Sequence, residues 1–157
     1  MANYVDYDLL AKQVASLIEG ERVRVSALAN VSALLNEALP DVSWVGFYWA
    51  HDDGDLVLGP FQGKVACTRI AWGKGVCGTA AKLDKTQLVP DVHAFPGHIA
   101  CDIASRSEVV VPIHEDGRVV GVLDLDSTTP ARFSEHDAAG LEAIVATLEA
   151  ALSRLEE

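Results

Sequence analysis

The stretch that most constrains the fold is an apolar segment with a short polar turn in its middle, SEVVVPIHEDGRVVGVLDLD. Residues 107–114 and 118–126 are rich in valine and leucine, as buried β-strands are. The turn EDGR between them contains the Asp-Gly pair that is typical of a tight hairpin. The segment therefore predicts two neighbouring antiparallel strands.

Three acidic residues lie inside this hairpin. Asp124 and Asp126 are two apart on one strand, so their side chains point to the same face. Counting back from the turn places Glu108 beside Asp126, so the three carboxyl groups should cluster at one end of the hairpin. Alternatively, the acids could be exposed to solvent at a sheet edge, and Asp126 could cap a turn. Burying them among valines and leucines is costly unless they meet a positive charge, so we predict a ligand site.

The rest of the chain carries helical patterns near both ends and strand patterns between them. In chain order we predict helices at 8–19 and 22–39, strands at 43–50, 56–58 and 64–70, a short helix beginning in GKGVCGTAA, a strand at 87–90, the hairpin, and a helix from the Ser134/Asp137 capping box to the C-terminus. Helices around hairpins favour an α+β fold, a central antiparallel β-sheet flanked by N- and C-terminal helices. We expect one domain over residues 1–157.

The charge of the chain excludes several partners. The formal net charge is −11, from 23 acidic and 12 basic residues, so a nucleic-acid backbone or an anionic membrane surface would be repelled. The start MANYVDYDLL has acids where a signal peptide has basic residues, and no apolar run approaches the roughly 18 residues of a membrane span. We therefore expect a cytoplasmic protein. The terminal helices could cover the sheet or pair with a second copy, which leaves a homodimer open.

Three cysteines, an odd number without a secretion signal, argue for reduced thiols rather than a structural disulfide framework. Cys67, in an alternating strand pattern, and Cys77, between glycines, are typical of small buried residues. Cys101 differs because it lies in a polar loop, three residues after His98 and next to Asp102. Such surroundings can keep a thiolate available, so we expect Cys101 to be functional.

Two other cysteine sites stay open at this point. A zinc site could use several cysteines and histidines, but no C-x-x-C pair occurs and the cysteine spacings match no common zinc module. Its ligands would come from Cys67, Cys77, Cys101, His93 and His98. A Cys-His-Asp hydrolase would need Cys101, His98 and Asp102, yet triad members are seldom neighbours in sequence.

Two aromatic residues could form the wall of a ligand site. Trp44 and Tyr48 are both even-numbered positions of the predicted strand SWVGFYWA, so they face the same way. Residues of this kind more often fill the core, and these two residues taken alone would be assigned there.

Several stretches of the chain together resemble one known family. They are VSALLNEALPDVSWVGFYW, LVLGPFQGKVACTRI, GKGVCGTA, DVHAFPGHIACD, SEVVVP and GVLDLDS. They resemble the free methionine-(R)-sulfoxide reductases, single-domain enzymes of the GAF fold, over about residues 7–152. GPFQGKVAC and GHIACD are specific to this family. The resemblance implies a GAF-like fold and the reduction of free L-methionine-(R)-S-oxide to L-methionine.

The resemblance also implies a role for each cysteine. Cys101, in GHIACD, matches the thiol that attacks the sulfoxide and becomes a sulfenic acid. Cys67, in GKVAC, matches the thiol that resolves it as an intramolecular disulfide, and Cys77 matches an auxiliary cysteine. Thioredoxin is the expected reductant, and we expect neither a metal nor an organic cofactor.

The pocket residues follow the same resemblance. Glu108, Asp124 and Asp126 match the acids that hold the substrate and assist the chemistry, and Trp44 with Tyr48 match its aromatic wall. We expect Asp126 or Glu108 to donate a proton, and Asp124 to bind the substrate ammonium. The alternative within this fold is a non-enzymatic GAF-type small-molecule or redox sensor, which would bind a small cationic metabolite without turnover.

Overall fold

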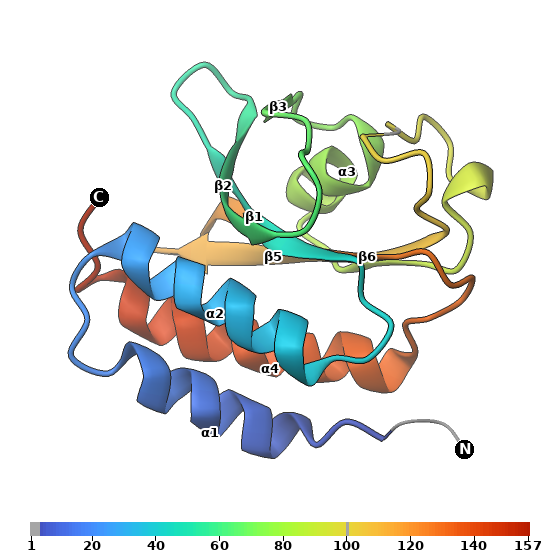
Figure 1. Ribbon diagram of the computed structural model, residues 1–157. Coiled ribbons are helices and arrows are strands. Elements are labelled where there is room, and N and C mark those ends of the chain that lie inside the picture. The colour runs from blue at the N-terminus through green and yellow to red at the C-terminus, as the bar shows by residue number, and fades with distance from the viewer. Residues whose placement is uncertain (1–3, 100) are drawn as a thin grey trace.

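The computed structural model describes residues 4–99 and 101–157 of the chain. In chain order its elements are α1 (Tyr7–Ile18), α2 (Arg24–Ala38), β1 (Trp44–Ala50), β2 (Leu56–Gln62), β3 (Arg69–Ile70), α3 (Gly75–Leu83), β4 (Gln87–Val89), the 3₁₀ turn η1 (Val92–Ala94), β5 (Ser107–Glu115), β6 (Arg118–Ser127) and α4 (Glu135–Leu152). The strands form an antiparallel six-stranded sheet of order β3-β2-β1-β6-β5-β4. Helices α2 and α4 cover one face, α1 packs against these two helices, and α3 covers the other face (Figure 1).

This architecture confirms the predicted α+β fold, with an antiparallel sheet flanked by the N- and C-terminal helices. The predicted hairpin forms β5 and β6, and its turn residues Asp116 and Gly117 have positive φ angles of 52° and 75°. A two-residue turn with both φ angles positive matches the twist of the strands that it joins. The turn sets the pairing next to it, and a one-residue register shift between Ile113 and His114 sets the pairing of the rest of the hairpin.

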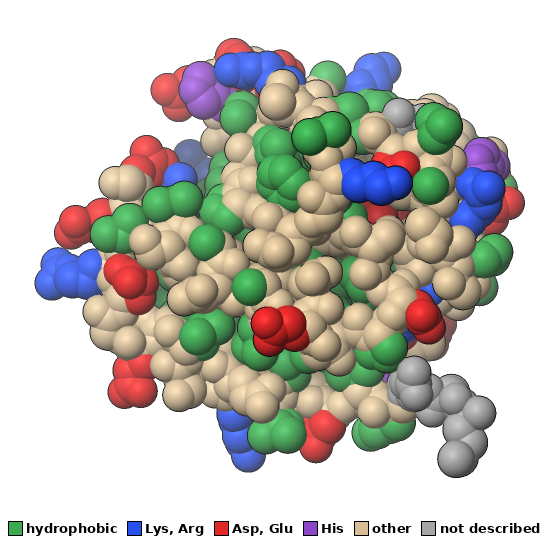
Figure 2. All heavy atoms as spheres, viewed as in Figure 1, with side chains coloured by type: hydrophobic (Ala, Val, Ile, Leu, Met, Phe, Trp, Pro, Cys, Tyr) green, Lys and Arg blue, Asp and Glu red, His purple; other side chains and the backbone are tan. Residues whose placement is uncertain are grey.

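The surface of the protein is acidic. Acidic side chains are spread over the face shown in Figure 2, in keeping with the net charge of −11. No helix in the described ranges is both long enough and apolar enough to cross a membrane.

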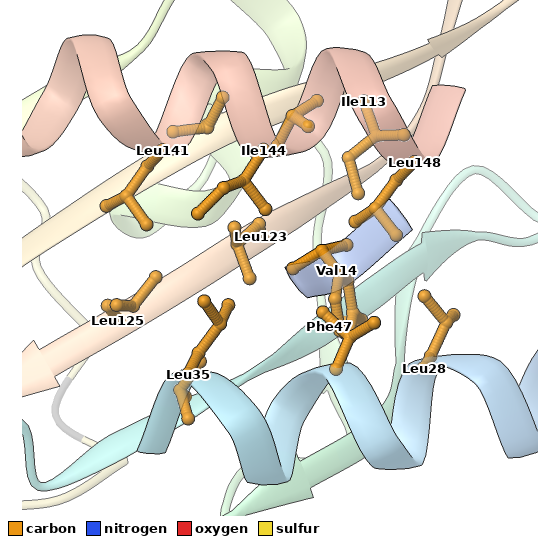
Figure 3. Packing of buried hydrophobic residues seen from close by; sticks show 14 of the residues in the cluster. Val14, Leu28, Leu35, Phe47, Ile113, Leu123, Leu125, Leu141, Ile144 and Leu148 are labelled. Carbon is orange, nitrogen blue, oxygen red and sulfur yellow. The ribbon is translucent and has the colours of Figure 1, made fainter. Parts of the chain in front are cut away.

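The alternation of side chains along the central strands separates two environments. Odd-numbered residues such as Phe47, Leu123 and Leu125 are fully buried against the helices α1, α2 and α4 (Figure 3). Even-numbered residues such as Tyr48 and Val122 belong to a second cluster on the α3 side. Because successive strand residues point to opposite faces, every even-numbered acid of β5 and β6 must also lie on the α3 side.

The predicted strand at 64–70 is wrong over most of its length. Only β3, two residues long, pairs with β2, and residues 63–68 are irregular. Two carbonyl groups of this segment accept hydrogen bonds from β1 side chains: Trp44 Nε1–H donates to Lys64 at 3.1 Å and Tyr48 O–H to Cys67 at 3.0 Å. Aromatic donors thus take the place of a neighbouring strand, and the segment lies across the α3 face of the sheet.

The C-terminal helix is shorter than its apolar pattern predicts. Helix α4 ends at Leu152, and the chain then turns back to the start of α2. The N–H of Arg24 donates to the carbonyl of Glu156 at 2.8 Å, and the N–H of Glu156 donates to the carbonyl of Arg22 at 2.6 Å. No side chain caps α2, so the carbonyl of Glu156 gives the N–H of Arg24 an acceptor. If α4 continued to the C-terminus, this N–H would lack that acceptor.

The predicted capping box of α4 is present and forms part of a larger buried network. The Ser134 side chain accepts from the N–H of Asp137, and the Asp137 carboxylate accepts from the Ser134 N–H at 2.8 Å. The same carboxylate accepts from the Tyr7 hydroxyl at 2.6 Å and from Arg132 at 3.3 Å. Burial raises the pKa of Asp137, but these donors outweigh it and the net pKa is lowered. One side chain therefore joins α1, α4 and the loop before α4.

We expect Asp137→Ala to lower the free energy of unfolding by about 2–4 kcal/mol, because it removes a cap and leaves a buried tyrosine hydroxyl without an acceptor. Urea denaturation of the purified proteins measures the loss. Glu135→Ala is the control, since Glu135 lies exposed in the same helical turn and should contribute only about 0.5 kcal/mol through the helix dipole. Equal losses in the two variants would contradict the proposed importance of the network.

Candidate active site

A pocket opens on the α3 side of the sheet. Carboxyl groups of β5 and β6 line it together with aromatic rings of β1. The other walls come from residues 64–66 and 70, from the start of α3, and from residues 98, 99, 101, 102 and 105 of the loop before β5. Seven of the residues predicted from the sequence line it: Trp44, Tyr48, Cys77, Cys101, Glu108, Asp124 and Asp126. The fold therefore brings together candidate residues that are spread from position 44 to position 126.

A disulfide bond joins Cys67 to Cys101. Their Cα atoms are 5.5 Å apart, although 34 residues separate them in sequence. This bond confirms the pairing that the family resemblance implied. Cys67 lies in the irregular segment 63–68 and Cys101 in the loop before β5, and both residues are half-buried. Because Cys101 also lines the pocket, the S–S bond adjoins the carboxyl groups rather than lying elsewhere on the surface.

The aromatic side chains form one continuous wall. The ring centroids of Trp44 and Tyr48 are 6.0 Å apart, and Phe61 of β2 stacks on Trp44 at 5.3 Å. Gly46, between the two wall residues on β1, pairs with Asp124 of β6. A Cβ atom at Gly46 would collide with the Trp44 ring and with Phe61, so the ring can lie over this position only because it is glycine.

The three predicted acids are brought together as the hairpin register requires. Glu108 pairs directly with Asp126 across β5 and β6, and Asp124 lies two residues further along the same face. Glu108 and Asp124 are buried, with 7% and 5% of their surface exposed, while Asp126 is partly exposed. Among the described residues no salt bridge reaches any of the three, and Asp124 Oδ1 is buried without a hydrogen-bond partner. The cluster therefore has unused capacity for a cation.

Burial raises the pKa of all three carboxyl groups. The pKa of Asp124 rises to about 6, although hydrogen bonds with Glu108 and the Cys77 thiol oppose the rise. Burial, followed by repulsion from Asp124 and Asp126, raises the pKa of Glu108 well above its ordinary range. The pKa of Asp126 is raised by burial and then by the charge of Asp124. At neutral pH the cluster can therefore hold a proton and donate it.

Cys77 is a buried thiol at the start of α3, outside the disulfide. Burial, and then the charges of Asp124 and Glu108, raise its pKa well above the ordinary value. Cys77, Glu108 and Asp124 each offer a ligand atom, and these atoms lie within 4.8 Å of one another. A metal would require the thiol and both carboxyl groups to lose their protons, which burial opposes. The arrangement favours a neutral thiol beside an acid over a metal centre.

The alternative zinc site and the alternative Cys-His-Asp hydrolase site fit the structure poorly. The Cys67–Cys101 bond removes two sulfur atoms from the five-residue zinc set. In the hydrolase alternative Asp102 would have to orient His98, but its carboxylate instead accepts the N–H of Ala104 at 2.9 Å and forms a turn of its own loop.

One pocket residue, Lys64, carried little signal in the sequence. Lys64 is the only Lys or Arg among the described residues that line the pocket. The strand predicted for residues 64–70 did not place Lys64 at the pocket, because the position of Lys64 depends on the irregular backbone of residues 63–68. His98 also lines the pocket, and burial together with the neighbouring His93 lowers its pKa, so its imidazole is neutral near pH 7.

Comparisons with known proteins agree with this fold and site. The GAF domain family matches residues 27–153. The free methionine-R-sulfoxide reductase of Escherichia coli K12 is 51% identical over 147 residues, which are 94% of this chain and 88% of that protein. A solved structure of fRMsr of Staphylococcus aureus in complex with substrate is 51% identical, covers 97% of this chain and 99% of that chain, and superposes with a TM-score of 0.90.

A further solved structure, free methionine-R-sulfoxide reductase from Neisseria meningitidis in complex with its substrate, is 44% identical and has a TM-score of 0.92. It covers 98% of this chain and 95% of that chain. The matches therefore extend over nearly the full length of both partners and include every segment that lines the pocket. The chain belongs to the GAF-domain family of free methionine-R-sulfoxide reductases.

Proposed function

We propose that this protein reduces free L-methionine-(R)-S-oxide to L-methionine, with Cys101 as the nucleophile and Cys67 as the resolving thiol. The observation that carries the proposal is the disulfide between these two residues beside a pocket with three carboxyl groups of raised pKa. Relatives that are 51% and 44% identical are named for this activity.

Each group of the substrate has a partner of matching chemistry in the pocket. The ammonium pairs with Asp124, whose Oδ1 atom is otherwise unpartnered. The S-methyl group packs against the Trp44 ring, a contact worth about 0.3–1.5 kcal/mol. A methionine sulfoxide inside a peptide has no ammonium and would leave buried carboxyl groups unpaired. Omissions of this kind can lower kcat/KM by several orders of magnitude, which accounts for selection of the free amino acid.

The chemical steps use the two cysteines and one acid. The Cys101 thiolate attacks the sulfoxide sulfur while Glu108 or Asp126 protonates its oxygen. The bond between the two sulfur atoms and the S–O bond of the sulfoxide then break as the oxygen passes to the Cys101 sulfur. Methionine leaves, and Cys101 becomes a sulfenic acid. The Cys67 thiol attacks this sulfur, water departs, and the Cys67–Cys101 disulfide forms. An external dithiol such as thioredoxin then reduces the disulfide by thiol exchange.

One assay separates this function from a non-enzymatic sensor. The purified protein is incubated with thioredoxin, thioredoxin reductase and NADPH, and then with the free (R) sulfoxide, the free (S) sulfoxide or a peptide sulfoxide. We expect NADPH consumption with the free (R) isomer alone. Binding of the sulfoxide without any methionine formed would instead support the sensor.

The substrate carboxylate gives a prediction for Lys64, the cationic side chain at the pocket. We expect Lys64→Met to raise KM for the free sulfoxide about 5–10-fold with little change in kcat, because an exposed ion pair contributes about 1 kcal/mol to binding. Initial rates over a range of sulfoxide concentrations measure both constants. Lys12→Met, on the exposed side of α1, is the charge-matched control. The same KM change in both variants would assign the effect to net charge and contradict a direct role of Lys64.

A further inference from the structure

Exposed apolar side chains flank both cysteines of the disulfide. Val65 stands two residues before Cys67, and Ile103 stands two residues after Cys101. The exposed fractions of Val65 and Ile103 are 89% and 84%, and that of Ile99, two residues before Cys101, is 39%. We call these three side chains, Val65, Ile99 and Ile103, the apolar rim.

The core does not account for the apolar rim, and the pocket accounts for only part of it. Val65 and Ile103 are the two most exposed large apolar side chains in the described part of the chain. None of the three rim residues belongs to either buried cluster. Val65 and Ile99 line the pocket, whereas Ile103 does not. Keeping apolar surface in water forgoes about 25 cal/mol for each Å² that could be buried. Apolar surface grouped at a reactive site therefore indicates a contact with another molecule.

The disulfide joins the two segments that carry the rim. Val65 belongs to the irregular segment 63–68, whereas Ile99 and Ile103 belong to the loop before β5. The S–S bond holds these two segments together with their cysteine Cα atoms 5.5 Å apart. With the disulfide formed, each rim side chain stands two residues from one of the two bonded cysteines.

We propose that the apolar rim is the docking surface for a protein dithiol that reduces the Cys67–Cys101 bond; this inference rests on the proposed function. A thiolate of the partner attacks one sulfur, the S–S bond breaks, and the other sulfur leaves as a thiolate that takes up a proton. The second thiol of the partner then breaks the mixed disulfide. Two electrons pass to the protein, and the partner becomes a disulfide.

A protein dithiol fits the rim better than other occupants do. The partner must bring its own sulfur into bonding contact, so the surface around that sulfur has to meet the side chains next to Cys67 and Cys101. A small dithiol has no surface to place there. The net charge of −11 would repel an anionic membrane, and acidic side chains are spread over the face of the protein in Figure 2.

The test measures disulfide reduction directly, with no sulfoxide present, so its result does not depend on reductase activity. The oxidised protein and its Val65→Ser/Ile103→Ser variant are each mixed with reduced thioredoxin, and the thioredoxin fluorescence change gives the second-order rate constant. We expect about a tenfold decrease in the double variant, since two well-placed apolar contacts contribute about 1–2 kcal/mol. Reduction by dithiothreitol should change less than twofold. Val25→Ser, equally apolar and 59% exposed on α2, is the matched control.

An unchanged thioredoxin rate constant in the double variant would overturn the inference. Equal decreases with thioredoxin and dithiothreitol would also overturn it, because the substitutions would then act on the S–S bond rather than on docking. If the double variant instead changed the protein from a dimer to a monomer with the thioredoxin rate intact, the rim would be a contact between copies of this chain. Failure of the wild-type protein to consume sulfoxide with either reductant would refute the proposed function separately.

Discussion

Cys101→Ser is expected to lower the rate of methionine formation by about 10³-fold or more. Serine has nearly the shape of cysteine, so the half-buried loop position should keep its structure. Its hydroxyl group stays protonated at neutral pH and is a poor nucleophile toward sulfur, whereas a thiol has an appreciable thiolate fraction. Methionine formed from the free (R) sulfoxide, quantified by chromatography, measures the loss.

Cys67→Ser is the matched control because it changes the other half of the same disulfide. Cys101 can still attack in this variant, so we expect about one methionine per chain and then a stop, with Cys101 left as a sulfenic acid that a thiol-specific reagent can trap. A burst of about one equivalent in Cys67→Ser and none in Cys101→Ser separates the two roles. A normal steady-state rate in Cys101→Ser would refute its assignment as nucleophile.

Most of the central hairpin was predictable from its turn and its alternation of side chains, but one register shift was not. The Asp116-Gly117 turn sets the pairing, and the period of two then sets which side chains share a face. A strict count from the turn would pair residue 108 with residue 125, and the register shift between Ile113 and His114 brings Glu108 opposite Asp126 instead. The clustering of the acids at one end of the hairpin could be inferred from the sequence, although the depth of their burial could not, since α3 and the loops that cover them come from elsewhere in the chain.

The segment around Cys67 could not be predicted from its own pattern. Residues 64–70 alternate like a strand, but the hydrogen bonds from Trp44 and Tyr48 hold the segment over the sheet instead. These partners are about 20 residues away in sequence, so no local signal contains them. The position of Lys64 at the pocket and the approach of Cys67 to Cys101 both depend on that irregular path. Only the family resemblance indicated the disulfide in advance.

The second large effect is expected at Asp124, where binding and stability should change in opposite directions. Its pKa is about 6 in the folded protein because of burial, against an ordinary value of 3.8. A raised pKa contributes stability that is complete below the unfolded value and is lost as pH rises through the folded value. Each pKa unit corresponds to about 1.4 kcal/mol, so this group should cost the empty protein about 3 kcal/mol in all, of which about 2.4 kcal/mol is lost between pH 4 and pH 7.

Asp124→Asn removes this titration while keeping the size of the side chain. We expect the variant to be about 2–3 kcal/mol more stable than the parent at pH 8 and about equally stable at pH 4, measured by urea denaturation without substrate. Glu108 and Asp126, whose pKa values are also raised, should keep part of the pH dependence in the variant. The same substitution removes the carboxylate that binds the substrate ammonium, so kcat/KM for the free sulfoxide should fall about 100-fold or more.

Asp116→Asn is the control, because it makes the same chemical change on the same hairpin at an exposed turn position where asparagine also accepts a positive φ. It should alter neither stability nor kcat/KM. The opposed changes at Asp124 have one physical origin: a carboxylate that is costly to bury in the empty pocket is the group that makes a cationic substrate bind there. A loss of stability at pH 8 in Asp124→Asn, or an unchanged kcat/KM, would contradict that origin.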